Sequence, residues 1–254
     1  MSVKIGVCNF TKKLYGLFNV VEVQKIFYNI PRKTTIKKWR EEAPENFEFT
    51  FKVFQGLTHD KSSPTWRRFT GKLTATEMNL VGNLRITDVT KRFIDEMVDI
   101  AKILDSPVIV VQTPAKFKPS NENFNNAVEF FQVFEERLNR AKVKSYIGWE
   151  PRGDWLQMPE KIKSILHATN RVIHVVDPFF STPVEITEVI YFRLHGKPYL
   201  NYKYQYTLQD FTKLRKTINE ITEMNAKKIY IMFNNVRMID DAKRFLEFLA
   251  SEEK

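Results

Sequence analysis

Short apolar runs alternate with longer amphipathic stretches along the whole chain. Eight runs have the composition and period of β-strands, at residues 4–8, 20–24, 47–54, 108–112, 143–149, 172–176, 189–194 and 229–233. Between them, apolar residues recur at helical spacing over residues 90–104, 121–140, 159–167, 208–224 and 240–249. Strands that alternate with helices predict βα units and a parallel sheet. Eight strands in 254 residues predict one TIM-like (β/α)8 barrel, a single domain over residues 1–254.

Two connections differ from those of an ideal barrel. Residues 9–19 leave too little chain for a full first helix, whereas residues 55–89 are far too long for a plain βα loop. Because this long segment leaves the C-terminal end of the third strand, we expect it to cover a functional site. The alternative fold is an open doubly wound sheet, but no glycine-rich phosphate-binding sequence follows the first strand.

Alternation within the strands predicts charged side chains inside the barrel. The inward positions are Tyr191, Arg193 and His195 in the seventh strand, Glu48, Thr50 and Lys52 in the third, and Glu22 and Gln24 in the second. Because unpaired buried charge is costly, we expect Lys52 to contact Glu22, another carboxylate or a bound anion. Two interpretations stay open, namely a structural ion network of Glu22, Lys52 and Arg193, or a polar pocket near the rim.

Every predicted strand also ends in a polar or ionisable group, at the end of the barrel where chemistry takes place in this architecture. The candidate site residues are Lys52 and His59 for the third strand, Gln112 for the fourth, Glu150 and Arg152 for the fifth, Asp177 for the sixth, Arg193 and His195 for the seventh, and Asn234 and Asn235 for the eighth. We predict that Glu150, Asp177 and His195 converge within about 8 Å of a common point.

These residue types support two kinds of chemistry. His195 and Glu150 could act as acid and base, or they could join Asp177 to hold one divalent metal ion. The simpler alternative is that Asp177 caps the next element and Glu150 pairs with Arg152. The anion-binding groups would be Lys52, Arg152 and Arg193, and the other substrate contacts would be His59, Gln112, Asn234 and Asn235.

Composition narrows the classes of protein and of partner. Forty Lys and Arg residues exceed thirty Asp and Glu residues, and the resulting charge of +10 favours an anionic small molecule or nucleic acid as partner. The single cysteine, Cys8, excludes a disulfide framework and indicates a reducing, cytoplasmic setting. The chain has no run of about 18 apolar residues, and the segment after Met1 alternates without an apolar stretch, so we expect neither a membrane span nor a signal peptide.

Basic and aromatic residues are interleaved in three segments, at residues 32–40, 66–72 and 201–206. In the long loop, Trp66 offers a stacking surface, and Arg67 and Arg68 offer guanidinium groups that suit phosphate oxygens. The alternatives are that residues 32–40 form a solvated basic helix, and that Trp66 only pins the loop while both arginines pair with local acids.

The ordered set of motifs resembles the YecE-like family, also called domain of unknown function 72. The matching stretches are residues 21–28 (VEVQKIFY) with Pro31, residues 49–52 (FTFK) followed by Thr58 and His59, Asp177-Pro178-Phe179, residues 191–196 (YFRLHG) and Phe233-Asn234-Asn235. The resemblance covers nearly the whole chain and implies a TIM-like barrel. It implies no activity, since the family has no established one. The first strand end differs from the Gly-Thr-Ser-Gly-Trp-like pattern of the family.

The leading functional hypothesis is an enzyme, a hydrolase or lyase that acts at the rim on a phosphorylated, sugar-like or nucleic-acid substrate. The competing hypothesis is a non-catalytic nucleic-acid-binding or adaptor protein that uses the basic surface. Binding that survives the loss of the rim residues would favour the second hypothesis.

Overall fold

The eight strands form one closed parallel barrel in a computed structural model, which describes residues 2–224 and 226–252. The strands are β1 (Ser2–Val7), β2 (Val20–Val23), β3 (Glu48–Lys52), β4 (Val108–Gln112), β5 (Tyr146–Glu150), β6 (Val172–Val176), β7 (Val189–Leu194) and β8 (Lys228–Phe233). Each strand pairs with its neighbour in sequence, and β8 pairs with β1 to close the barrel. The predicted barrel is confirmed. The single-domain prediction also includes Met1, Asn225 and residues 253–254, which lie outside the described residues.

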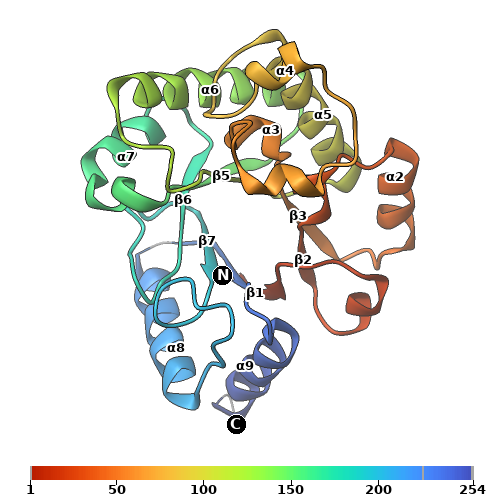
Figure 1. The fold of residues 1–254 in the computed structure, drawn as a ribbon. Coiled ribbons are helices and arrows are strands. Elements are labelled where there is room, and N and C mark those ends of the chain that lie inside the picture. Colours follow the sequence, from red (N-terminus) through yellow and green to blue (C-terminus); the bar gives the residue numbers. More distant parts are fainter. Residues whose placement is uncertain (1, 225, 253–254) are drawn as a thin grey trace.

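The helices surround the strands (Figure 1). They are α1 (Lys25–Tyr28), α2 (Lys33–Glu42), α3 (Gln55–Thr58), α4 (Ala75–Asn79), α5 (Asp88–Leu104), α6 (Asn121–Arg140), α7 (Pro159–Leu166), α8 (Leu208–Glu223) and α9 (Met238–Glu252), with short 3-10 helices η1 (Lys12–Gly16), η2 (Pro64–Arg68) and η3 (Gly153–Gln157). Among the described residues, no helix has both the length and the apolar character needed to cross a bilayer.

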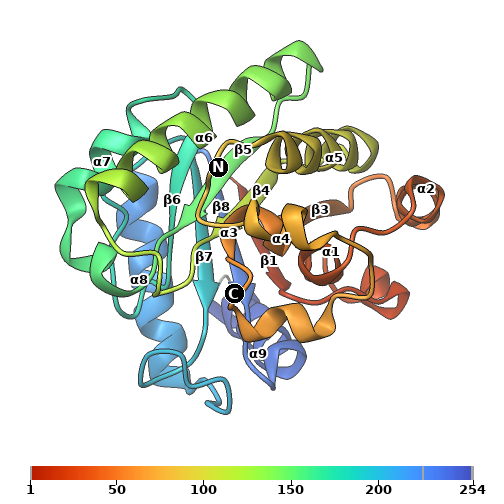
Figure 2. The ribbon, with the colours of Figure 1, turned by 45° about the horizontal axis from the view of Figure 1, so that its top comes forward.

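Both unusual connections have the lengths that the sequence indicates. Only the short helix η1 links β1 to β2, in place of a full first helix. The segment from β3 to α5 contains α3, η2 and α4, which lie on the near side of the strands in Figure 2. A capping box at Thr74 starts α4, because the Thr74 side chain and that of Glu77 each accept from the other's backbone N–H. The segment is therefore folded rather than an open loop.

The bounds of the fifth and third strands differ from the prediction for local reasons, and those of the first, second and eighth strands differ by one or two residues at an end. The fifth strand starts at Tyr146 rather than at Val143, because the Val143 N–H still donates to Leu138 O in the turn that ends α6. Lys142 in that turn takes a positive φ of 57°, which no strand residue adopts. The third strand is shorter than residues 47–54, since Phe54 already precedes the helical turn α3.

Successive residues of a strand face opposite sides, so the apolar residues form two clusters, one between the strands and the helices and one inside the barrel. Ile190, Phe192 and Leu194 of β7 lie in the cluster between strands and helices, whereas Tyr191 lies in the cluster inside the barrel. The same period makes Arg193, two residues after Tyr191, an inward side chain that is 1% exposed. The predicted inward face of β7 is therefore confirmed, and its polar side chains follow one another along the barrel interior toward the C-terminal rim.

Candidate active site at the C-terminal rim

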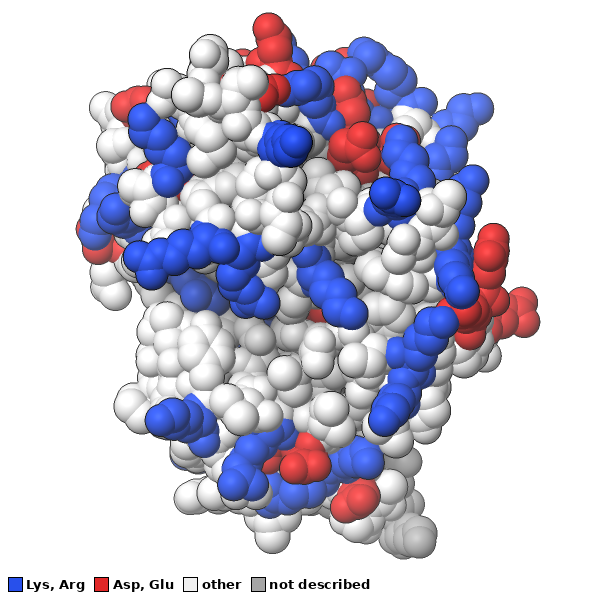
Figure 3. Space-filling view, turned by 45° about the vertical axis from the view of Figure 1, so that its right-hand side comes forward, with Lys and Arg blue, Asp and Glu red and all other residues white. Residues whose placement is uncertain are grey.

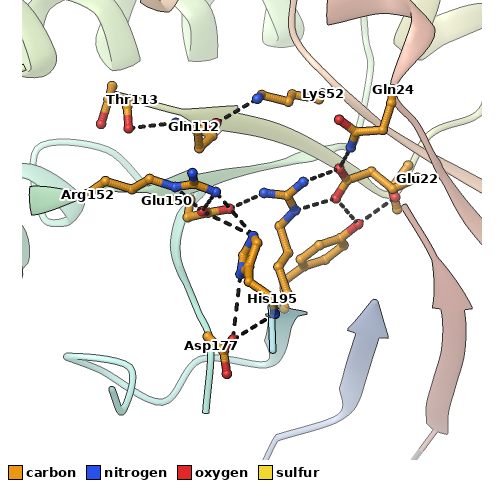
Figure 4. Close-up of polar contacts among 12 residues, drawn as sticks. Glu22, Gln24, Lys52, Gln112, Thr113, Glu150, Arg152, Asp177 and His195 are labelled. Atoms are coloured by element: carbon orange, nitrogen blue, oxygen red, sulfur yellow. Dashed lines mark hydrogen bonds and ion pairs between the residues drawn. The ribbon is translucent and has the colours of Figure 1, made fainter. Parts of the chain in front are cut away.

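Arg193 is the centre of a buried ion triad with Glu22 and Glu150, two carboxylates that are labelled in Figure 4. Its Nη2 lies 2.9 Å from Glu22 Oε1, and its Nε donates to Glu22 Oε2 at 3.0 Å. Its Nη1 donates to Glu150 Oε2 on the opposite wall. One guanidinium therefore joins β2, β5 and β7, which is the fork geometry that arginine provides.

Hydroxyl and amide groups complete the coordination of Glu22. The Tyr191 hydroxyl donates to Glu22 Oε2 at 2.9 Å, and Gln24 Nε2 donates to Glu22 Oε1. Thr50 Oγ1 lies 2.7 Å from the Tyr191 hydroxyl. Glu22 is fully buried, so these bonds replace the water that its charge would hold. The inward phases predicted for the second and third strands are confirmed.

A second guanidinium holds Glu150 from the solvent side. Arg152 Nε donates to Glu150 Oε1 at 2.7 Å. Burial alone would raise the pKa of Glu150, but Arg152 and Arg193 outweigh it and hold that pKa well below its usual range. Glu150 therefore stays ionised at neutral pH. The prediction that it exchanges protons with a substrate is unsupported, whereas the alternative pairing with Arg152 is confirmed.

His195 lies between Arg152 and Asp177. Because a guanidinium only donates, the 3.2 Å contact of Arg152 Nη2 with His195 Nε2 requires the lone pair of that nitrogen. The ring proton is then on Nδ1, which faces Asp177 Oδ2 at 3.6 Å and has no hydrogen-bond partner within the described structure. Burial lowers the pKa of His195, so the ring is neutral at pH 7.

The backbone around His195 fixes the position of its ring. The His195 N–H donates to Asp177 Oδ2 at 2.8 Å, and the Phe179 N–H donates to Asp177 Oδ1 at 3.1 Å. Gly196 follows with φ +86°, and a Cβ there would lie 2.1 Å from Asn201 O, so only glycine fits this turn. Asp177 thus orients His195 and also caps the next turn. The predicted convergence of Glu150, Asp177 and His195 is confirmed.

Lys52 contacts neither Glu22 nor another carboxylate among the described residues, so the carboxylate part of its prediction is wrong, whereas contact with a bound anion stays a prediction. Its Nζ donates to Gln112 Oε1 at 2.6 Å and lies 3.7 Å from the centre of the Phe27 ring. The physical reason is that Glu22 and Glu150 are already held by arginines. Gln112 is itself fixed, since its Nε2 donates to Thr113 O at 2.8 Å.

His59 lies beside this lysine at the end of α3. Its Nδ1 lies 2.7 Å from Thr58 Oγ1, and its ring packs edge-on against Phe27. Burial, reinforced by the charges of Lys52 and Arg152, lowers the pKa of His59 to about 3. It is therefore a neutral polar group at the rim.

The proposed metal ligands do not form a metal site. Both Asp177 oxygens accept backbone N–H groups, and both Glu150 oxygens are bonded by guanidinium groups. Arg152 and Arg193 therefore occupy the Glu150 oxygens that a divalent ion would need as ligands. Among the described residues, no group of three or more His, Cys, Asp or Glu side chains is arranged to hold a metal ion.

Asn235 is held by structural contacts of its Nδ2, which give no support to its predicted role as a substrate contact. Its Nδ2 donates to Asp241 Oδ2 on α9 and to Tyr204 O, each at 2.7 Å. Strand alternation explains this, because Asn235 continues the outward phase of Phe233 whereas Asn234 continues the inward phase of Met232. Asn234 is half-buried and keeps its place at the rim.

The long segment uses its tryptophan for packing. Trp66 Nε1 donates to Asp60 O at 2.8 Å, and its ring packs against Phe54 and Phe69. The alternative that Trp66 pins the loop is therefore confirmed. The Arg68 guanidinium lies 3.6 Å from the centre of the Tyr28 ring instead of pairing with an acid, and Arg67 is exposed.

The predicted basic segment at residues 32–40 contributes to α2, as the solvated-helix alternative states.

A small pocket adjoins the triad residues. It is lined by Glu150, Asp177 and His195 together with Phe180, Ser181, Tyr199 and four apolar residues. Tyr202 packs its ring edge-on against His195, with 5.9 Å between centroids. Sequence reasoning missed Tyr199 as a site residue. The aromatic alternation of residues 201–206, which follows β7, was the signal that pointed to this loop.

A larger hollow lies at the opposite, N-terminal end of the barrel. It is lined by Glu48, Lys228 and Tyr230, among others. The Glu48 carboxylate already accepts from Lys228 at 2.7 Å and from the Tyr230 hydroxyl at 2.6 Å. This end of a barrel usually serves stability rather than chemistry, and its internal pairing fits that role.

Comparison with protein-family models assigns the chain. The model described as "Protein of unknown function DUF72" matches residues 11–254. The chain belongs to the DUF72 family. The YecE-like resemblance of its motifs is thereby confirmed. No curated protein matches the chain.

Solved structures share the DUF72 fold along the whole chain. A DUF72 family protein from Enterococcus faecalis is 21% identical with a TM-score of 0.69, and covers 99% of this chain and 98% of its own. One from Thermotoga maritima is 19% identical with a TM-score of 0.61, covering 98% and 100%. The 3-keto-D-glucoside 4-epimerase of E. coli is 13% identical with a TM-score of 0.60, covering 99% of each chain. At these identities the likeness establishes the fold alone.

Proposed function

We propose that this DUF72 protein is an enzyme that uses His195 as a general base on a sugar-like or phosphorylated small molecule, in a hydrolysis or elimination reaction. The observation that carries the proposal is the row Asp177–His195–Arg152. A neutral imidazole presents its Nε2 lone pair to Arg152, and the Asp177 carboxylate lies 3.6 Å from Nδ1, where it would stabilise the imidazolium once the ring takes up a proton. That arrangement is what a base at neutral pH requires.

The other charged groups have separate roles in this proposal. Arg152 is the outermost cation and binds an anionic or hydroxyl group of the substrate, in place of its contact with His195. Arg193 and Glu22 are positioning residues, because their bonds fix Glu150 and through it Arg152. Asn234 and Gln112 supply amide groups on the neighbouring strands. None of these steps uses a metal ion, since the carboxylates are already occupied.

The substrate class follows from the hydrogen-bond donors of the site and is supported by the related barrels. Two guanidinium groups and the Lys52 amine supply donors in the upper barrel, and such donors suit an anionic or hydroxyl group of a substrate. Among similar folds, one is titled 3-keto-D-glucoside 4-epimerase and another D-allulose 3-epimerase. We take a carbohydrate or its phosphate as the first class to test.

The test combines a ligand screen with paired histidine variants. Sugars and sugar phosphates are screened by thermal shift and by NMR for turnover with wild-type protein. We expect His195→Gln to lower turnover by about 10²-fold or more while it retains binding. His167→Gln is the matched control, because His167 is exposed and pairs with Glu185 on the outer surface. Equal turnover in wild type and His195→Gln would overturn the proposal, and so would a screen without any binder.

The basic surface supports a second candidate, binding of single-stranded nucleic acid without catalysis. Figure 3 shows lysine and arginine side chains spread over one face, with fewer acidic ones among them. The Arg68 guanidinium, in the segment that follows β3, stacks on the Tyr28 ring of α1. Cations combined with aromatic rings suit a phosphate backbone with unstacked bases.

A further inference from the structure

The environment of Lys52 differs from that of the other cations in the barrel. Lys52 ends β3, is 7% exposed, and has an amide oxygen and the face of Phe27 as its contacts. Within the described residues, no carboxylate lies at ion-pair distance from its Nζ. Arg193 and Arg152, by contrast, both bond carboxylate oxygens. Lys52 is therefore a buried amine without a carboxylate partner in the described part of the chain.

Such an amine favours its neutral form. Burial is the main cause, and the positive charges of Arg193 and Arg152 add to it; together they lower the pKa of Lys52 to about 7. Glu150 and Glu22 act in the opposite direction but are neutralised by the same arginines. His59, the remaining titratable group nearby, is neutral and adds no charge. A large share of Lys52 is consequently nucleophilic at neutral pH.

We propose that Lys52 is a catalytic nucleophile that forms an imine with the carbonyl carbon of the substrate. The proposal rests on the proposed function, since it takes the substrate to be an open-chain sugar-like aldehyde or ketone, or its phosphate. The Nζ lone pair forms a C–N bond as the carbonyl π bond breaks, and a proton passes from nitrogen to oxygen to give a carbinolamine. The hydroxyl oxygen then takes a proton from solvent, the C–O bond breaks, water leaves, and the nitrogen lone pair completes the C=N bond of a protonated imine. No oxidant or reductant is needed.

The neighbours of Lys52 suit this step. Gln112 Oε1 accepts from the amine and so directs the nitrogen lone pair away from that wall of the barrel. The Phe27 ring face lies 3.7 Å from Nζ and stabilises positive charge on a protonated imine. The imine then withdraws electrons from the adjacent carbon, which makes the proton on that carbon easier for a base to remove.

The first test measures the reactivity of each lysine in the wild-type protein without substrate. Competitive labelling with acetic anhydride over pH 5 to 10, followed by peptide mapping, gives the midpoint for each amine. We expect a midpoint near pH 7 for Lys52. Lys197 is the internal control, because it lies near the same rim in an ion pair with Asp210, which raises its pKa. A Lys52 midpoint equal to that of Lys197 would overturn the proposal.

The second test traps the imine itself. The protein is incubated with glyceraldehyde 3-phosphate, dihydroxyacetone phosphate or glyceraldehyde and sodium cyanoborohydride, and the modified residue is located by mass spectrometry. We expect modification of Lys52 at least 10-fold faster than of Lys197, and none at that position in Lys52→Arg, whose folding is checked by circular dichroism. Modification confined to surface lysines would overturn the inference.

The two proposals fail in different ways. Turnover that persists in Lys52→Arg would overturn the imine step and leave the His195 proposal intact. Trapping at Lys52 combined with full turnover in His195→Gln would overturn the base assignment and leave the imine step intact.

Discussion

Replacing Arg193 by Met tests whether the buried triad holds the barrel together. The substitution leaves Glu22, which is fully buried, and Glu150, which is 4% exposed, without the cation that joins them. Glu150 keeps Arg152, but Glu22 keeps only hydroxyl and amide partners. Breaking a buried pair by removing one partner costs about 3–5 kcal/mol, because an uncompensated charge remains. For a chain of this length that corresponds to a drop in Tm of roughly 6–20 °C.

The effect of pH on this cost has a definite sign. In the wild type the pKa of Glu150 is held below its usual range, so the stability that its charge contributes is present above about pH 4.3. That contribution is lost as the pH falls through the lowered pKa. The difference in the free energy of unfolding between Arg193→Met and wild type is therefore largest at neutral pH. This difference becomes smaller in acid, because a carboxyl group that has lost its arginine can take up a proton and then no longer buries a charge.

The assay is urea unfolding followed by circular dichroism at pH 7 and pH 4. Arg140→Met is the matched control, since the Arg140–Glu136 pair is 66% and 59% exposed and should contribute about 0.5 kcal/mol or less. The double variant with Glu22→Gln should recover part of the loss, because it removes one of the stranded charges. A loss in Arg193→Met no larger than in Arg140→Met, or one that grows in acid, would refute the reasoning.

Three further outcomes are expected. The pKa of His59 falls from about 6.5 in the unfolded chain to about 3 in the folded protein, so protonation of the unfolded chain lowers the free energy of unfolding by about 1.4 kcal/mol for each pH unit between pH 6.5 and pH 4. His59→Gln should therefore lose less stability than wild type in that window, as measured by urea unfolding at each pH. Parallel plots of the free energy of unfolding against pH would contradict this. Asn235→Ala should lower the free energy of unfolding by about 1–3 kcal/mol, as Asp241 loses a buried donor, without a change in ligand affinity; weaker binding would return Asn235 to the site. Arg67→Ala with Arg68→Ala should reduce the salt dependence of single-stranded DNA or RNA binding by about one to two phosphate contacts; an unchanged slope, or a wild type that does not bind at low salt, would remove the nucleic-acid candidate.

The barrel could be predicted from the sequence because each of its rules is local. Strand alternation, helical periodicity and connection length each act within a few residues, and together they specify eight βα units. Strand β4, from Val108 to Gln112, has its predicted bounds, as does helix α6 from Asn121 to Arg140. The late start of β5 could not be predicted, because it depends on the positive φ of Lys142 in the preceding turn.

The sequence could predict which residues lie in the site, but not which of them form ion pairs and hydrogen bonds with one another. Alternation places Glu22, Lys52 and Arg193 inside the barrel, and strand order brings Glu150, Asp177 and His195 to one side of the rim. Which charge bonds which depends on side-chain reach across the barrel, and that has no sequence period. The same alternation rule, applied to Asn234 and Asn235 separately, would have excluded Asn235, because successive residues of a strand face opposite sides.

The ion pairs of the two arginines with Glu22 and Glu150, which could not be predicted from the sequence, also determine the protonation states in the site. Arg193 reaches both Glu22 and Glu150 because a guanidinium can donate in two directions at once. With Arg152 on the outer side of Glu150, both of these carboxylates are held by arginines, whereas the Asp177 carboxylate accepts backbone N–H groups. The amine of a lysine at position 193 could not bridge both walls with the same fork of donors. The buried ion triad thus keeps Glu150 ionised and leaves Lys52 without a carboxylate partner among the described residues.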